Sequence, residues 1–362
     1  MQKHTQSKSA CSLRTGFFVG PNGQGKTNFL EALYMLAYGK SFRSNRDEPL
    51  VRRGEKEMSL SGSFSADLES PVQDEISVKY VDRQKEIRFN GSAVKDRKQL
   101  VELLPVIIFA HDDIAFVKGS PDNQRWFFNQ CLSTYRVGFI DSLRAYSKLL
   151  RNRNQIIRDG NLELLDVFNQ QISLSGLEIL QARKDLILEF NTLFSPLFAS
   201  VSGISTPLEI EYRPSWKIEE DQGLEKVSRE VISILESRLE TDIQMKTTTS
   251  GPHRDRFMFR LGGRDFLQEA STGQVRLMSL LLRAAQARLF ARMSGRKPIL
   301  LIDDVLLELD GEKRGKFMSE LPEYDQVFFT FLPDEHIEKY RRGRGIVYRV
   351  DSGEYTEITG SE

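Results

Sequence analysis

The sequence predicts an α/β fold of the P-loop nucleoside triphosphatase type, with a mixed sheet and an added helical domain. Three observations carry this prediction. The segment "FFVGPNGQGKTNFLEALYML" (17–36) joins an apolar strand, a glycine-rich loop and a helix. The segment "ILLIDD" (299–304) is an apolar strand that ends in two carboxylates. Between them, the stretch from about residue 124 to 198 has mostly helical periodicity.

The glycine-rich loop fits the pattern G-x-x-x-x-G-K-[ST] without a mismatch. Glycines let several backbone N–H groups face one anion, and the start of the following helix adds partial positive charge. Lys26 is expected to reach the β- and γ-phosphates of a nucleotide, and the Thr27 hydroxyl to bind Mg²⁺. The candidate phosphate-binding residues are Gly20, Pro21, Asn22, Gly23, Gln24, Gly25, Lys26 and Thr27.

Composition narrows the class of protein. The 362 residues are enough for two or three domains, and 51 basic residues balance 51 acidic ones, so the chain is not an overall polycation. Cys11 and Cys131 are the only cysteines, which argues against a disulfide framework or a thiolate metal site. The N-terminus has no apolar signal core, and no apolar run approaches the ~18 residues of a membrane span. We therefore expect a cytoplasmic protein without metals other than a nucleotide-bound cation.

The remaining elements follow from periodicity along the chain. Alternating segments over 58–91 predict antiparallel strands, and short apolar runs predict buried strands at 105–110, 299–303 and 326–331. A strand is expected at 208–212, an amphipathic helix at 224–239, a strand within 251–263 and a long helix from Gly273. The expected division is residues 1–122 for the first half of the ATPase head, 123–240 for the helical arm, and 241–362 for the second half of the head.

The carboxylates at the end of "ILLIDD" complete a Mg²⁺-nucleotide site. Asp303 would hold Mg²⁺ directly or through water, and Asp304 would orient or deprotonate the attacking water. Lys26 and Asp303 lie near opposite ends of the chain, much farther apart than the ~100–200 residues of one domain. The two halves of the nucleotide site are therefore expected to lie on either side of a large insertion. This argues against a small-molecule kinase or a GTPase, and the guanine-reading pattern N-K-x-D is absent from the sequence.

A second possible anion cradle opens the helix in "EASTGQVRLMSLLLRAAQ". Ser271 is a candidate N-cap, and Gly273 leaves the first turn open. A single nucleotide site does not need a second cradle, whereas a head-to-tail dimer could use it to contact the γ-phosphate held by the other subunit. An ordinary capped helix explains the same residues equally well.

Taken together, these motifs resemble the head domains of ABC-type and SMC-like ATPases, and most closely the RecF family of bacterial recombination-repair proteins. The matching segments, in the family's order, are "GPNGQGKTNFLEALYMLAYGKSFR", "IIFAHDDIAFVKGSPDNQRWFFN", "TTTSGPHRDRF", "STGQVRLMSLLLRAAQ" and "LLIDDVLLELDGEKR". The paired Asp303–Asp304 also fits RecF, since many transporter ATPases carry Asp-Glu at this point.

The resemblance implies a two-lobed protein, with an ATPase head and a helical arm where SMC proteins carry coiled coils. It implies an ATP-induced homodimer that binds single-stranded, duplex or gapped DNA and hydrolyses ATP slowly as a switch. RecO and RecR would be its partners. With them, the protein would indirectly aid the loading of RecA onto DNA, and it would thereby aid the SOS response. By position, Lys26, Asp303 and Asp304 would be catalytic, with Mg²⁺ on Thr27 and Asp303. The resemblance also implies that Ser271 and Gly273 contact the partner's γ-phosphate, and that Asp310 lies at the dimer seam.

The sequence departs from the family at three places. Residues 1–12 do not look like the two strands that usually precede the loop strand, so we expect the sheet edge and the adenine contacts to differ. His111 and Asp112 stand where the family often has Pro-Glu, and Thr330 stands where transporter ATPases have a switch histidine.

Three basic clusters are possible contacts for DNA phosphates, although each could also be an ordinary solvated face. The first two are the stronger DNA candidates. The alternatives left open are a transporter-type ATPase subunit and an SMC-like tether. The clusters are Lys40, Arg43, Arg46, Arg52 and Arg53; Arg151 and Arg153; and Lys339, Arg341, Arg342 and Arg344.

Overall fold

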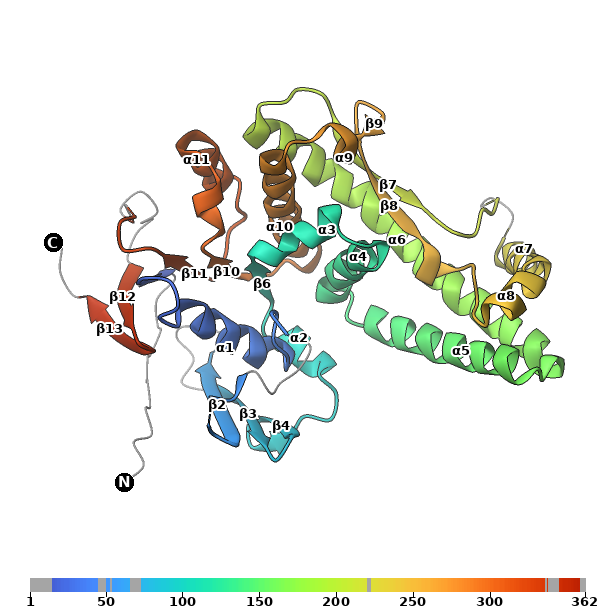
Figure 1. Cartoon of the computed structure of the whole chain (residues 1–362), viewed down its shortest axis with the longest axis horizontal. Coiled ribbons are helices and arrows are strands. Elements are labelled where there is room, and N and C mark those ends of the chain that lie inside the picture. The colour runs from blue at the N-terminus through green and yellow to red at the C-terminus, as the bar shows by residue number, and fades with distance from the viewer. Residues whose placement is uncertain are drawn as a thin grey trace. The chain divides into compact units, whose positions relative to one another are not determined.

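The computed structural model describes residues 15–44, 50–52, 54–65, 73–219, 223–335, 337 and 345–358. The chain forms two compact units (Figure 1). Unit 1 comprises the residues up to His111 together with those from Gly295 onward, and unit 2 comprises Asp112–Ser294.

Unit 1 is built on a six-stranded sheet of order β13-β12-β1-β11-β10-β6. Its strands are parallel except for β13, which runs antiparallel to β12. The predicted apolar strands are therefore confirmed as neighbours in the order β6, β10, β11, and the loop strand β1 lies between β11 and β12. The bounds are β1 Thr15–Val19, β6 Val106–Phe109, β10 Ile299–Asp303, β11 Gln326–Phe331, β12 Gly345–Asp351 and β13 Glu354–Ile358.

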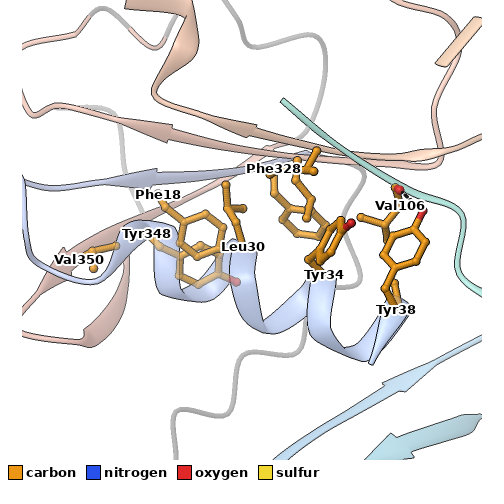
Figure 2. Packing of buried hydrophobic residues seen from close by; sticks show 11 residues of the cluster. Phe18, Leu30, Tyr34, Tyr38, Val106, Phe328, Tyr348 and Val350 are labelled. Atoms are coloured by element: carbon orange, nitrogen blue, oxygen red, sulfur yellow. Dashed lines mark hydrogen bonds between the residues drawn. The ribbon is translucent and has the colours of Figure 1, made fainter. Parts of the chain in front are cut away.

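Helix α1 (Lys26–Tyr38) follows the loop and packs on this sheet. Its Leu30, Tyr34, Ala37 and Tyr38 lie on one face, at spacings that bring helical side chains together. Figure 2 shows this face against Phe18, Val106, Phe328, Tyr348 and Val350 from four different strands. The helix ends at Gly39, whose left-handed conformation lets its N–H donate to the Met35 carbonyl. This packing fixes the position of the phosphate loop at the start of α1.

A second, four-stranded antiparallel sheet of order β2-β3-β4-β5 also belongs to unit 1. Buried and exposed residues alternate along β3, as expected for a sheet with one face in a core. The predicted strands over 58–91 are thus confirmed. The remaining elements of unit 1 are β2 Glu57–Phe64, β3 Asp74–Val81, β4 Gln84–Phe89, β5 Ser92–Ala93, α2 Lys98–Leu103 and α11 Gly311–Ser319, with 3₁₀ turns η2 His111–Asp113 at the border between the units and η5 Val305–Glu308.

Unit 2 combines long helices with a three-stranded sheet of order β7-β8-β9. The helical arm predicted for 124–198 corresponds to α4, α5 and α6, and the predicted strand at 208–212 to β7. Its helices are α3 Ile114–Lys118, α4 Pro121–Tyr135, α5 Phe139–Asp159, α6 Leu165–Ser202, α7 Leu224–Ser237, α8 Leu239–Met245, α9 Phe266–Glu269 and α10 Thr272–Ser294, its strands are β7 Leu208–Arg213, β8 Arg256–Leu261 and β9 Arg264–Asp265, and its 3₁₀ turns are η3 Leu162–Leu164 and η4 Pro252–Arg254.

The division into units differs from the division expected from the sequence. The border between the units follows His111, whereas a border was expected after residue 122, and residues 241–294 lie in unit 2 together with the helical arm. Helix α10 explains the second difference. Most of its residues between Val275 and Phe290 are buried, including the polar Arg283 and Gln286, and it packs against α3, α4 and α6 within unit 2.

Candidate nucleotide site

The phosphate loop connects β1 to α1 in unit 1 and is shaped by its glycines. Gly20 continues the strand, donating its N–H to the Phe331 carbonyl at 3.1 Å. A Cβ at Gly20 would lie 2.3 Å from the Val350 carbonyl oxygen, so only glycine fits there. Gly25 has φ of 105°, a conformation that glycine adopts without strain. Pro21, Asn22 and Gly23 form the exposed tip.

Lys26 and Thr27, the first residues of α1, meet the two carboxylates from β10. The buried Lys26 Nζ donates to the Gly20 carbonyl at 2.7 Å and lies 3.4 Å from Asp304 Oδ2. The Thr27 hydroxyl donates to Asp303 Oδ1 at 2.9 Å, across 276 residues of chain. The parts predicted to form one nucleotide site therefore converge in the folded protein.

Asp303 and Asp304 are held by Thr330, a residue that sequence reasoning did not assign to the site. Asp303 and Thr330 are partners in the parallel register of β10 and β11. The Thr330 Oγ lies 3.0 Å from Asp303 Oδ1 and from Asp304 Oδ1, and accepts a hydrogen bond from the Asp304 N–H at 2.8 Å. The signal was present in the sequence, because neighbouring parallel strands end at the same edge of a sheet.

Electrostatics at Asp303 reflect its position in the core. Burial raises the pKa of the Asp303 carboxyl, and hydrogen bonds from Thr27 and Thr330 oppose this rise. The nearby Asp304 charge raises the pKa further, and the proximity of His111 lowers it. His111 is half exposed, and its Nδ1 lies 2.8 Å from Glu308 Oε1. The departure from the family pattern at His111 thus falls at the edge of the nucleotide site.

The C-terminal hairpin β12–β13 also reaches the phosphate loop, which the sequence did not predict. The Ser352 N–H donates to Gln24 Oε1 at 2.7 Å, and the Gly353 N–H donates to the Gln24 carbonyl at 2.9 Å. The Tyr355 hydroxyl donates to the Gly25 carbonyl at 3.0 Å. The Gln24 side-chain oxygen and backbone carbonyl are therefore both bonded to the hairpin. The backbone N–H of Gln24 is the group that can face a phosphate.

The donor set fits Mg²⁺. The Thr27 hydroxyl and the Asp303 carboxylate converge at one point beside the phosphate loop. Mg²⁺ prefers oxygen ligands and is commonly held by one or two protein groups together with phosphates and water. Among the residues that the structure describes, no group of three or more His, Cys, Asp or Glu side chains is arranged to hold a metal by itself.

Ser271 and Gly273 lie in unit 2, at the exposed start of α10. The Ser271 N–H donates to Gln274 Oε1 at 2.8 Å, and the Gln274 N–H donates to Ser271 Oγ at 3.3 Å. This reciprocal pair is a capping box, so the predicted N-cap is confirmed. The role of these residues at a second subunit's γ-phosphate stays a prediction. Asp310, in unit 1, caps α11 by accepting from the Lys313 N–H at 2.9 Å.

The structure shows which of the basic side chains proposed to contact DNA are exposed and which are buried. Arg153 was a candidate DNA contact, but its side chain is fully buried against Asp242, so that prediction is wrong. Arg151 is exposed. Burial and the neighbouring Arg97 lower the pKa of Lys40, whereas Arg43 is half exposed beside Glu31. Arg52 is exposed; Arg46, Arg53, Lys339, Arg341, Arg342 and Arg344 lie outside the described residues.

Comparisons with known proteins place the chain in a family. A family model described as the RecF/RecN/SMC N-terminal domain matches residues 3–354. "DNA replication and repair protein RecF" of Treponema pallidum (strain Nichols) is 38% identical over 339 residues, covering 93% of each chain. The protein of the same name from Leptospira interrogans (strain Fiocruz L1-130) is 31% identical over 90% of this chain and 87% of its own.

Solved structures agree with these relatives. A structure of the recombination mediator protein RecF with ATP, in the RecFOR pathway, has a TM-score of 0.84 and 27% identity, and covers 95% of this chain and 93% of that one. An Smc head bound to the C-winged helix domain of ScpA has a TM-score of 0.52 and 15% identity over 96% of this chain and 90% of that one, which shows a shared fold alone. The chain therefore belongs to the RecF/RecN/SMC family and, within it, to the RecF group.

Proposed function

We propose that this protein is an ATP-dependent DNA-binding protein of replication and recombinational repair. The observation that supports this most directly is the convergence of Lys26 and Thr27 with Asp304 and Asp303 at a phosphate loop. The relatives named DNA replication and repair protein RecF and the RecF structure with ATP support both the nucleotide and the process. No helix in the described part of the chain is long and apolar enough to cross a membrane.

Each residue of the candidate site would have its own role in binding or hydrolysing the nucleotide. Backbone N–H groups of Gly20–Thr27 would bind the phosphates, and Lys26 would neutralise the β- and γ-phosphates. Thr27 and Asp303 would hold Mg²⁺, which when bound offsets phosphate charge. Asp304 would orient the attacking water, with Thr330 fixing the position of its carboxylate. Hydrolysis would be slow and would serve as a switch.

ATP-induced dimerisation would couple the nucleotide to DNA and to the partner proteins. ATP would join two copies, with Ser271 and Gly273 of one copy at the γ-phosphate of the other and Asp310 at the seam. The dimer would bind single-stranded, duplex or gapped DNA. It would work with RecO and RecR, aid RecA loading indirectly and so support the SOS response. The RecFOR pathway named for the related RecF structure supports these partners.

The test is DNA binding and molecular mass as a function of nucleotide. We expect a monomer without nucleotide, a dimer with ATP under non-hydrolysing conditions, and DNA retention only in the second state. Lys26→Ala should abolish both responses, because the lysine charge at the phosphates is lost. DNA binding by Lys26→Ala that is still stimulated by ATP would contradict the switch, and a constant monomer would contradict the dimer.

A further inference from the structure

One face of α5 carries a row of basic side chains. Arg144, Lys148, Arg151 and Arg158 are all exposed and follow one another at spacings of four, three and seven residues, with the exposed Gln155 between the last two. At 3.6 residues per turn, these spacings return each side chain to the same side of the helix. We call Arg144, Lys148, Arg151, Gln155 and Arg158 the α5 stripe.

The α5 stripe faces away from the core of unit 2. The buried residues Tyr146, Arg153, Ile156 and Ile157 lie half a turn away from it, on the side where α5 packs against α6 and α8. Figure 1 shows α5 and the first part of α6 coming together toward the turn that joins them. The basic side chains are therefore not needed to attach α5 to its unit.

Two of the four charged side chains in the α5 stripe lack a partner in the described part of the chain. Lys148 and Arg151 make no hydrogen bond or ion pair with any residue that the structure describes. Arg144 lies 3.5 Å from Asp141, with both side chains about half exposed, and such pairs contribute little. The Arg158 guanidinium donates to the neutral Gln155 at 2.9 Å. Gln155 in turn donates to the Asp159 carboxylate at 2.8 Å. Lys148 and Arg151 are therefore the two members of the stripe whose charges have no partner among the described residues.

We propose that the α5 stripe contacts the phosphate backbone of duplex DNA; this inference rests on the proposed DNA-binding function. From Arg144 to Arg158 the helix rises about 21 Å, which exceeds the ~12 Å width of the major groove, so the stripe is long enough to reach phosphates on both edges of a groove. Exposed Lys and Arg side chains bind phosphates without reading sequence.

The composition of the stripe favours duplex over single-stranded DNA. Single-strand binding surfaces combine positive charge with aromatic side chains on which bases stack. The two aromatic residues of α5, Phe139 and Tyr146, are buried, and the stripe itself consists of Arg, Lys and Gln. It therefore offers charge without a stacking platform.

The test compares Lys148→Gln/Arg151→Gln with a matched control, Lys226→Gln/Arg229→Gln. The control pair is also an exposed Lys and Arg three residues apart on an amphipathic helix of unit 2, α7. Binding of a blunt duplex and of a single strand of equal length is measured with ATP over a salt series. For the α5 variant we expect about tenfold weaker duplex binding and a salt slope reduced by about two, because two phosphate contacts are lost.

The outcomes separate the inference from the proposed function. For the α5 variant, nucleotide binding and the unfolding midpoint should stay as in the unsubstituted protein, since Lys148 and Arg151 have no hydrogen-bond or ion-pair partner among the described residues. Duplex binding by the α5 variant with unchanged affinity and slope would overturn the inference while leaving the proposed function intact, and so would weakening of single-strand binding alone. Absence of any DNA binding by the unsubstituted protein with ATP would overturn both.

Discussion

Thr330 links the two carboxylates of the nucleotide site. Its hydroxyl lies within hydrogen-bond distance of both Asp303 and Asp304, and its Oγ also accepts the Asp304 N–H. Asp304 has φ of 53°, a left-handed conformation that is uncommon for a residue with a side chain. The Thr330 contact helps to hold this conformation. The residue thereby positions a candidate catalytic group without itself being expected to touch the nucleotide.

We predict that Thr330→Val lowers kcat for ATP hydrolysis about tenfold, while the affinity for ATP changes little. Valine keeps the shape of the side chain but leaves the Asp304 N–H without its acceptor and frees both carboxylates; a loss of about 1.4 kcal/mol at the transition state corresponds to tenfold. Steady-state hydrolysis and equilibrium nucleotide binding measure the two effects separately. Thr330→Ser keeps the hydroxyl and should retain activity. Equal activity of the valine and serine variants would show that the hydroxyl has no positioning role.

Helix α5 gives two arginines, two residues apart, opposite environments. Arg151 lies on the outer face, whereas Arg153 is fully buried. The Arg153 guanidinium donates to Asp242 at 2.7 Å, to Asn169 at 2.8 Å and to Thr248 at 2.8 Å. Asp242 also accepts from Thr249, so this buried charge pair ties α5, α6 and α8 to the segment that precedes β8.

Arg153→Met should destabilise unit 2 by about 3–5 kcal/mol, because it leaves the Asp242 carboxylate buried without its counter-charge. Arg151→Met, at an exposed position, should change stability by no more than about 0.5 kcal/mol. Chemical denaturation followed by far-UV circular dichroism provides the comparison. Similar midpoints for the two variants would mean that the pair contributes nothing beyond the packing of the side chain.

The C-terminal hairpin β12–β13 is the element that completes the phosphate loop. Two N–H groups of its turn and the Tyr355 hydroxyl hold Gln24 and Gly25. Tyr355 also packs its ring against Phe18 and Phe29, on the strand and the helix that flank the loop. The hairpin occupies the sheet edge next to β1. Residues 1–12, where the sequence led us to expect a departure from the family, lie outside the described residues.

Over the whole chain, the nucleotide site is assembled from distant segments of a single unit. The phosphate loop, the β10 carboxylates, Thr330 and the C-terminal hairpin all belong to unit 1. The candidate dimer contacts Ser271 and Gly273, and the α5 stripe, belong to unit 2. The candidate nucleotide site and the proposed DNA contact therefore lie in different units of the chain.

Hydrogen exchange with and without ATP should reveal this arrangement. We predict slower exchange in unit 1 at residues 20–30, 303–304 and 351–355, because ligand binding to the folded state adds about 2.7 kcal/mol of stability at a hundred times Kd. Helix α5 should be unaffected in the absence of DNA. Protection at residues 271–274 should appear only where ATP also produces a dimer. Uniform protection of both units, or none at residues 351–355, would contradict the assignment.

Local pattern was sufficient for much of the fold. Strand–loop–helix around Gly20–Thr27, the apolar strand before Asp303 and the cap at Ser271 each depend on a short run of residues, so periodicity and motif spacing could predict them. The hairpin over 345–358 was missed, although its turn "DSGE" lies between alternating segments. Residues 241–294 were expected to belong with the phosphate loop and the carboxylates, but they lie in unit 2. The apolar residues of α10 indicate a buried helix, but its sequence does not say in which unit it is buried.

The sequence alone determined the phosphate loop, the paired carboxylates, the strands that carry them and the membership of the RecF group. Each is encoded in contiguous residues whose chemistry and spacing are sufficient to read. Only the tertiary structure decided that Thr330 and the C-terminal hairpin support the site, that Arg153 is buried and that Arg151 belongs to an exposed basic stripe. These properties depend on contacts between side chains that are far apart in the sequence. Such contacts leave Arg151 exposed and bury Arg153, although both are arginines of the same helix.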